Sequence, residues 1–295
     1  MKKRYYTERR TIFDYVNYLI LLIVTLLCII PVLHTLWASF SSPVLLAQHE
    51  GVILWPLDFT LDGYKLVLKN GSIGMGYLNT IIYVVSATTL NILMTSLGAY
   101  VCSRKKSLFS KPITMLITFT MFFSGGLIPF YLTVNSLGLT DTRLAMILPV
   151  AISAWNLIIM RTSMADLSES VEEAAQIDGA NEIIILFRIV LPLIKPVLAV
   201  MVLFYAVGHW NSWFNAMIFL RDRNLYPLQL ILREILLTND TTQIMQVADT
   251  GNENDLYRVL VKYCTTVVAT VPILCIYPFL QRYFVKGIMI GSIKG

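Results

Sequence analysis

Few residues in this chain are of the types and spacings that carry out chemistry. Its three histidines, His34, His49 and His209, lie at unrelated positions, and no serine, cysteine or carboxylate sits at a helical offset that would complete a triad. The four cysteines form no C-x-x-C pair and have no histidine at metal-ligand spacing. We therefore predict no catalytic residues, no metal site and no enzymatic activity.

The chain also has no nucleotide-binding loop of its own. A P-loop requires the pattern G-x-x-x-x-G-K-[ST], and no Gly-Lys dipeptide occurs anywhere in the sequence. The glycine-rich stretch 71–76 has the wrong spacing, and we expect it to be a flexible lead-in to a membrane span. We therefore predict no cofactor in this chain.

Polar side chains within one apolar stretch, 196–220, could meet a substrate. At 100° per residue they fall on or beside one narrow stripe of a helix. An amide inside an apolar span is costly unless it faces protein or water, so we expect the stripe to face the interior of a helical bundle, where it suits a hydroxyl-rich substrate. The same groups could instead bond to neighbouring helices. The candidates for a substrate pathway are Tyr205, His209, Asn211, Ser212 and Asn215.

The elements that must position these residues are long apolar runs. Six stretches contain no Asp, Glu, Lys or Arg, and nearly all can hold the roughly 20 apolar residues that span a bilayer. None alternates like the strands of a membrane barrel, so helices are the only spanning form left. An apolar fraction of 56% and a mean hydropathy of +0.68 agree. We predict one all-α membrane domain, 1–295, with six transmembrane helices at about 15–39, 77–102, 113–133, 144–160, 196–220 and 260–281.

The distribution of positive charge predicts the orientation of these helices. If the N-terminus is cytoplasmic, fifteen of the 23 Lys and Arg residues fall on cytoplasmic segments, and the others are spread over longer outer loops. Both termini are therefore predicted to be cytoplasmic. This asymmetry accounts for the net charge of +5, and no basic and aromatic platform for nucleic acid is present. The first apolar run is longer than the core of a secretory signal, so we expect it to be an uncleaved span.

Residues 166–192, between the fourth and fifth predicted spans, form the one charged segment with strong helix signals. Two possible capping boxes open it, at Asp166 to Glu169 and at Ser170 to Glu173. Gly179 then stands where a helix C-cap tolerates positive φ, and Asn181 can cap a second short helix. We expect Pro192 to stop that helix or kink it into the next span.

Two environments suit such a helical elbow. An amphipathic helix in a loop can simply rest on the lipid surface. The pair Ala174-Ala175 favours docking into another protein's cleft instead, because a lipid-facing helix would favour larger apolar side chains.

The elbow resembles the coupling motif of the membrane subunits of bacterial ATP-binding-cassette (ABC) importers, with the pattern E-A-A-x3-G-x9-I-x-L-P. Its seven fixed positions are matched by Glu173, Ala174, Ala175, Gly179, Ile189, Leu191 and Pro192. Over its whole length the chain is similar to the maltose-type permease subunits, and segments 208–213 and 283–295 look most like the branch that imports complex oligosaccharides such as alginate or rhamnogalacturonan fragments. The predicted coupling residues are Glu173, Ala174, Ala175, Asp178, Gly179, Ile189, Leu191 and Pro192.

The resemblance implies a function and a set of partners. The chain would be a multi-pass permease of the bacterial cytoplasmic (inner) membrane, paired with a second permease, two cytoplasmic ATPases that bind ATP and Mg, and an extracytoplasmic binding protein that delivers an oligosaccharide. Glu173 would contact an ATPase, Ala174 and Ala175 would allow close approach, and Gly179 would set the elbow angle. ATP-driven closure of the ATPases would then produce alternating access. In this family the partner permease can make most of the sugar contacts.

Other functions stay open on the sequence alone. A secondary carrier or channel would transport without an ATPase, and a membrane-embedded enzyme would need a catalytic cluster. Within the importer interpretation, outer segments 41–69 and 221–262 are expected to meet the binding protein. Residues 227–237 are predicted to form a helix too short to span, packed on the bundle or against a docked partner. The tail 287–295 would reach the ATPases or be disordered.

Overall fold

The computed structural model describes residues 11–104, 108–237 and 254–292, and in the last helix it describes side chains only for residues 256–275. Within these ranges the regular structure is helical, apart from one isolated antiparallel bridge between Ser41 and Phe59. The predicted all-α fold is therefore confirmed. The chain divides into two compact units, Met1–Asn70 with Asn239–Val268 and Gly71–Thr238 with Ala269–Gly295.

The described residues of unit 1 form three helices and the first part of a fourth: α1 (Ile12–Ser39), α2 (Pro43–Gln48), α3 (Asp62–Lys69) and α15 (Asn254–Ser292). The end of α1 is held by polar contacts, because the Ser39 hydroxyl lies 2.7 Å from the Tyr64 hydroxyl and the Cys264 thiol donates to the Ser39 carbonyl at 3.3 Å. Gly63 lets α3 approach α15 closely, since a Cβ there would lie 2.6 Å from Cys264 Sγ. The core of unit 1 therefore gathers where these helices meet.

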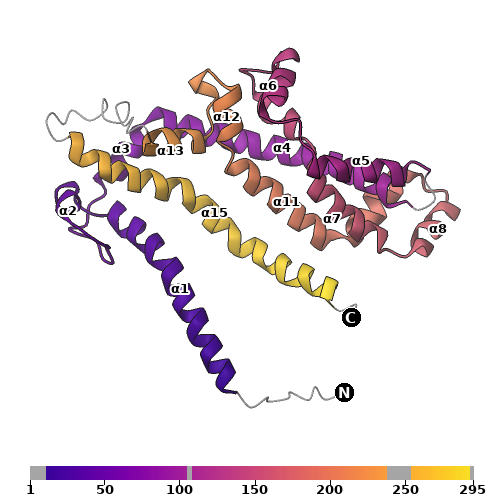
Figure 1. Cartoon of the computed structure of the whole chain (residues 1–295), viewed down its shortest axis with the longest axis horizontal. Coiled ribbons are helices and arrows are strands. Elements are labelled where there is room, and N and C mark those ends of the chain that lie inside the picture. Colours follow the sequence, from indigo (N-terminus) through magenta and orange to yellow (C-terminus); the bar gives the residue numbers. More distant parts are fainter. Residues whose placement is uncertain (1–10, 105–107, 238–253, 293–295) are drawn as a thin grey trace. The chain divides into compact units, whose positions relative to one another are not determined.

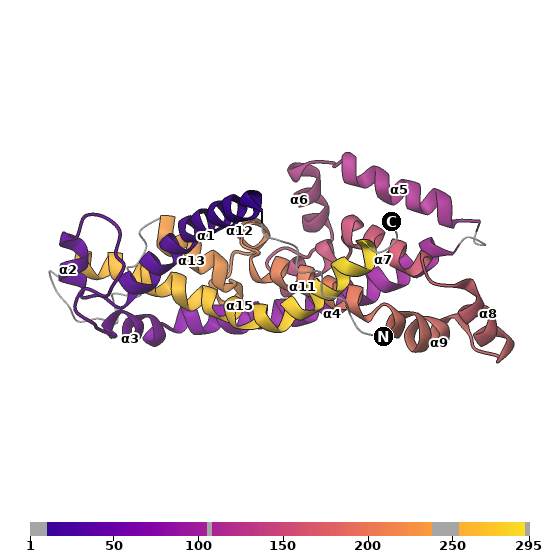
Figure 2. The same ribbon diagram turned by 90° about the horizontal axis from the view of Figure 1, so that it is seen from below.

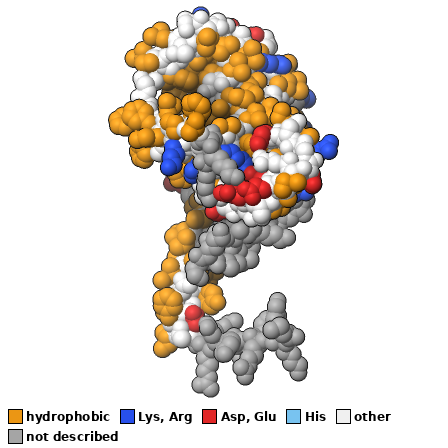
Figure 3. Space-filling model, turned by 90° about the vertical axis from the view of Figure 1, so that its right-hand side faces the viewer, with side chains coloured by type: hydrophobic (Ala, Val, Ile, Leu, Met, Phe, Trp, Pro, Cys, Tyr) orange, Lys and Arg blue, Asp and Glu red, His pale blue; other side chains and the backbone are white. Residues whose placement is uncertain are grey.

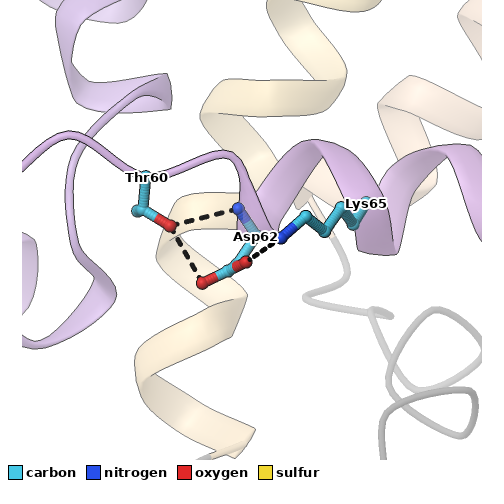
Figure 4. A network of polar contacts seen from close by, with 3 residues as sticks. All are labelled: Thr60, Asp62 and Lys65. Atoms are coloured by element: carbon cyan, nitrogen blue, oxygen red, sulfur yellow. Dashed lines mark hydrogen bonds and ion pairs between the residues drawn. The ribbon is translucent and has the colours of Figure 1, made fainter.

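The start of α3 is fixed by a small polar network, shown in Figure 4. The Thr60 hydroxyl donates to Asp62 Oδ2 at 2.9 Å and accepts from the Asp62 backbone N–H at 3.2 Å. Lys65 Nζ lies 2.8 Å from Asp62 Oδ1. The bond from Lys65, followed by that from Thr60, lowers the pKa of Asp62. A carboxylate that stays charged in this first turn complements the helix N-terminus.

Unit 2 is organised around one long helix, α4 (Gly71–Ser103). Figure 1 shows α13 beside the first half of α4 and α7 beside its second half. Large side chains that are almost fully buried fill the core near the end of α4, among them Leu157, Met160, Ile185, Val190 and Met201. The other helical elements of unit 2 up to α7 are α5 (Ser110–Phe122), α6 (Leu127–Ser136), η1 (Arg143–Met146), η2 (Leu148–Val150) and α7 (Ala154–Ala165). Those that follow are α8 (Glu169–Ile177), α9 (Glu182–Ile184), η3 (Ile185–Val190), α10 (Leu191–Leu193), α11 (Lys195–Trp210), α12 (Phe214–Phe219), η4 (Arg223–Leu225) and α13 (Leu228–Leu237).

Three predicted spans are continuous helices. The helices α1, α4 and α15 contain the predicted ranges 15–39, 77–102 and 260–281 and run beyond them. They are long and apolar enough to cross a membrane, and with three bent helix pairs the described residues hold up to six such spans.

The prediction of one continuous helix in each of the ranges 113–133, 144–160 and 196–220 is wrong. The chain bends by 118° between α5 and α6, where Gly126 has φ +83°, a conformation that strains other residues. It bends by 47° before α7, which Ser153 caps through Asn156 N–H at 3.4 Å. Figure 2 shows α5 and α6 as two arms meeting at their bend. In the third case α11 ends at Trp210, and α12 begins only at Phe214.

The glycine-rich stretch 71–76 is helical, so its prediction as a flexible lead-in is also wrong. A Cβ on Gly76 would lie 2.7 Å from Ile231 Cδ1 and 3.2 Å from the Leu228 backbone, which shows that α13 packs directly on this turn. The short helix predicted at 227–237 is confirmed by α13, which packs on α4.

Replacing Gly76 with valine is expected to destabilise the protein by about 1–3 kcal/mol, because the new methyl groups would push the backbone of α13 away from α4. Gly74 is the matched control, since it lies in the same first turns and has no atom within 4 Å of a Cβ. The thermal unfolding midpoint of the purified protein measures the difference. Equal midpoints for Gly76→Val and Gly74→Val would show that the packing is not tight.

Candidate coupling site and polar core

The predicted elbow is present as two short helices separated by a glycine joint. Helix α8 ends at Ile177, and Gly179 follows with φ +80° and donates its N–H to the Gln176 carbonyl at 3.0 Å. The Asn181 side chain accepts from Ile184 N–H at 2.9 Å and so caps α9, as predicted. The predicted capping boxes are wrong, because Asp166 caps the C-terminus of α7 and Ser168 precedes α8.

The second half of the elbow leads directly into the next long helix. Ile189 lies in the π-helical turn η3, and Leu191 and Pro192 lie in α10. The helix axis then bends by 89° into α11, which begins with Lys195-Pro196. A π-turn and a proline are common causes of such bends. Pro192 therefore stands at the predicted place, where the elbow meets the next span.

The two alanines of α8 differ in exposure. Ala175 is buried against the core of unit 2, whereas Ala174 is exposed. Glu173, Asp178 and Gly179 are exposed as well. Ala175 thus seats α8 on its own unit, while the remaining predicted residues on this helix present a small, acidic surface.

The elbow is fastened to the end of α4 through side chains that the sequence analysis missed. Arg104 forms an ion pair with Glu172 of α8, and its guanidinium lies 3.8 Å from the centre of the Tyr100 ring. The Tyr100 hydroxyl donates to Glu182 of α9. Burial lowers the pKa of Arg104, while nearby Tyr100, Glu182 and Glu169 oppose this shift.

A cavity of about 590 Å³ lies beside these contacts, between the ends of α4 and α7 and the elbow. Arg104 lines it together with the acidic residues Glu169, Glu172, Glu173 and Glu182. Figure 3 shows acidic side chains gathered beside basic ones at the end of unit 2 that carries α8. The end of the elbow is therefore strongly charged, in contrast to the apolar surface around it.

Tyr205 and His209 lie in a second group of polar contacts inside unit 2. The Tyr205 hydroxyl is 2.6 Å from the Thr95 hydroxyl and accepts from Ser153 N–H at 3.2 Å. His209 Nε2 lies 2.6 Å from Asn91 Oδ1, so this nitrogen carries a proton and donates.

The Asn91 amide group completes the polar core, because its Nδ2 donates to the Val150 carbonyl at 2.6 Å. Its side chain and that of Thr95 come from α4 and are fully buried. The contacts therefore satisfy backbone groups on both sides of the bend before α7. The spacing of Asn91 and Thr95, one turn apart in an apolar run, was a signal for this site.

The other three pathway candidates do not share a stripe with Tyr205, because the helix ends before them. Asn211 is the C-cap of α11 and is exposed, while Ser212 and Asn215 are half-buried beyond it. Among the described residues, no partner is found for the side-chain amides of Asn211 and Asn215. The helical wheel for 196–220 was wrong for this reason. Within the same part of the chain, no group of three or more His, Cys, Asp and Glu side chains could hold a metal ion.

The described residues define a class of protein: a helical membrane protein with up to six candidate spans and a charged helical elbow. Residues 9–290 match the sequence model of the binding-protein-dependent transport system inner membrane component, and the chain belongs to this family. It is thus an integral inner-membrane permease subunit of the ABC transporter type and is not itself catalytic.

Two curated relatives from Bacillus subtilis (strain 168) match almost the whole chain. The polygalacturonan/rhamnogalacturonan transport system permease protein YtcP is 38% identical over 287 residues, covering 97% of this chain and 100% of the relative. Protein LplC is 40% identical over 293 residues, covering 98% and 97%. A chain of a solved bacterial ABC transporter, involved in the import of the acidic polysaccharide alginate, superposes with a TM-score of 0.86. It is 31% identical, with 94% of this chain and 100% of that chain covered.

Proposed function

We propose that this chain is one of two permease subunits of an ATP-driven importer that moves an oligosaccharide across the inner membrane by alternating access. The elbow is the observation that carries this proposal. It consists of helix α8, a glycine joint, helix α9 with its Asn181 cap, and an 89° bend into α11. A short rigid segment of this kind transmits a displacement better than a flexible loop does.

The proposed topology has six spans with both termini and the elbow in the cytoplasm. Three spans are the continuous helices α1, α4 and α15, two are the bent pairs α5 with α6 and η1–η2 with α7, and one is α11, which an 89° bend joins to the elbow. The distribution of Lys and Arg supports the orientation. Broken spans are tolerated where neighbouring protein groups satisfy the freed backbone, as Tyr205 and Asn91 do before α7.

The energy source in this proposal lies outside the chain. Two cytoplasmic ATPases bind ATP and Mg, and each of the two permeases docks its elbow on one of them. Glu173 and Ala174 of α8, with Asp178 at its C-cap, form the exposed surface that meets the ATPase, and Gly179 sets the angle between α8 and α9. When the ATPases close, α8 is displaced and the spans follow as in a hinge motion.

The substrate class in this proposal is an acidic oligosaccharide delivered by an extracytoplasmic binding protein. This choice is supported by the similarity to YtcP, a polygalacturonan/rhamnogalacturonan transport permease, and to the solved alginate importer. Uptake of labelled trigalacturonate by proteoliposomes tests it, with the complex purified through a tag on this chain and its binding protein added. Uptake of neutral trisaccharides alone would contradict the acidic class.

Replacing Gly179 with valine is expected to reduce ATP-driven uptake roughly tenfold or more, since a β-branched residue disfavours the φ of +80° that sets the elbow angle. Gly138→Val is the matched control. Gly138 has φ +67° and, like Gly179, no atom within 4 Å of a Cβ, but it lies after α6 and outside the elbow. Both variants therefore suffer similar local strain.

Uptake and membrane insertion are compared for both variants in the same proteoliposomes. Equal uptake by Gly179→Val and Gly138→Val would count against a coupling role for the elbow. Transport by the isolated chain in liposomes, without ATPases or a second permease, would instead favour the secondary carrier or channel.

A further inference from the structure

The joint at Gly179 cannot hold the elbow at one angle by packing. A Cβ at Gly179 would meet no atom within 4 Å, and the residue itself is exposed. Helix α8 has nine residues, of which Ala175 is buried, whereas α9 continues into η3, where Ile185 and Val190 are buried in the core of unit 2. A helix as short as α8 needs tertiary contacts to keep its place. Side-chain contacts must therefore fix α8 to the rest of unit 2.

Those contacts converge on the last turn of α4. Arg104 pairs with Glu172 on one side of the joint, and Tyr100 bonds to Glu182 on the other. Gln176 of α8 also donates to Glu182 at 3.2 Å and links the two short helices across Gly179. Since the Arg104 guanidinium stacks on the Tyr100 ring, the two anchors form one connected group.

The ion pair in this group is shielded from water. The side chains of Arg104 and Glu172 are only 23% and 14% exposed. Exposed pairs contribute little to stability, but removing one member of a shielded pair leaves a charge with no compensation in a poorly hydrated place. Loss of either side chain should therefore release α8 rather than leave it in position.

We propose that Arg104 is a positioning residue that fastens the elbow to α4, so that both move together when the elbow is displaced. This inference rests on the proposed coupling function. Glu172 and Tyr100 act through Arg104: Glu172 pairs with its charge, and the Tyr100 ring stacks on its guanidinium. Force applied to α8 then reaches α4 directly, in addition to reaching α11 through the chain itself.

The test measures the position of the elbow separately from transport. Spin labels at Ser170→Cys in α8 and Val85→Cys in α4, in a chain whose own cysteines are replaced, report the distance between the two helices within the assembled complex. Both positions are exposed. Arg104→Gln and Glu172→Gln are expected to broaden this distance distribution, while the ATPases still co-purify with the chain.

ATP-driven uptake of trigalacturonate should fall on the order of tenfold in both variants, within the usual range of coupling between sites. The charge exchange Arg104→Glu with Glu172→Arg should restore part of the narrow distribution and part of the uptake. Lys111→Gln is the control, because it removes an exposed charge at the start of α5. It should change neither measurement.

A narrow distance distribution in both single variants would overturn the proposal, and so would a broadened distribution with uptake unchanged. Using two variants keeps the test valid if one of them fails to fold. If the unmodified complex contained no ATPase, the proposed function would fail, whereas the distance measurement would still decide whether Arg104 holds the elbow.

Discussion

Replacing Asn91 with leucine is expected to destabilise the protein by about 2–4 kcal/mol, because it leaves the His209 ring and the Val150 carbonyl, both on half-buried residues, without this partner. Asn91 is fully buried in α4, accepts from His209 Nε2 and donates to the Val150 carbonyl, each at 2.6 Å. Leucine has a similar volume, so the loss should come from hydrogen bonding rather than from a cavity. The thermal unfolding midpoint in detergent measures it.

Asn211→Leu is the matched control for this experiment. Asn211 is exposed, and its side-chain amide makes no hydrogen bond within the described ranges. The double variant Asn91→Leu with His209→Leu should recover part of the loss, since replacing both partners removes the unpaired N–H. Equal midpoints for Asn91→Leu and Asn211→Leu would show that the polar core does not stabilise the bend before α7.

The sequence was sufficient where local signals determine the structure. Helices α1 and α4 were predicted because their apolar runs have no internal break strong enough to stop a helix, and even Pro31 lies inside α1. The elbow was predicted because a glycine after α8 and an asparagine before α9 act within a few residues. Capping and joint residues of this kind depend little on the rest of the fold.

The break before α7 could not be predicted because distant residues compensate for it. A run without charge indicates that a segment is apolar but does not show whether its helix continues. The bend before α7 frees backbone groups that Tyr205 and Asn91 satisfy from α11 and α4. A helical wheel also assumes one continuous helix, so Asn211 was placed on the same stripe as Tyr205.

The same limit applies to Arg104 and its partners. The contacts join residues that are far apart in the sequence, and Arg104 was counted only as one of several cytoplasmic charges. Its role depends on the burial of Glu172 and on the ring of Tyr100, neither of which can be read from charge distribution.

Replacing Asn79 with leucine is expected to destabilise the protein by about 2–4 kcal/mol, since its side chain connects α4 to two other segments. Its Nδ2 donates to the Asn224 carbonyl at 2.6 Å and to the Tyr226 carbonyl at 3.2 Å. Its Oδ1 accepts from Arg143 Nη2 at 3.2 Å. All three contacts are lost together, and Asn79 is fully buried.

Neighbouring side chains on α4 hold the same loop, which allows the contribution of Asn79 to be separated. The Tyr83 hydroxyl donates to the Leu225 carbonyl at 2.8 Å, and the Thr80 hydroxyl accepts from Leu228 N–H at 2.9 Å. A double-mutant cycle of Asn79→Leu and Tyr83→Phe should therefore show coupling, because either change loosens the loop that the other residue binds. Asn215→Leu, at a half-buried amide without a described partner, is the control. Strictly additive losses in unfolding midpoint would mean that the two side chains hold the loop independently.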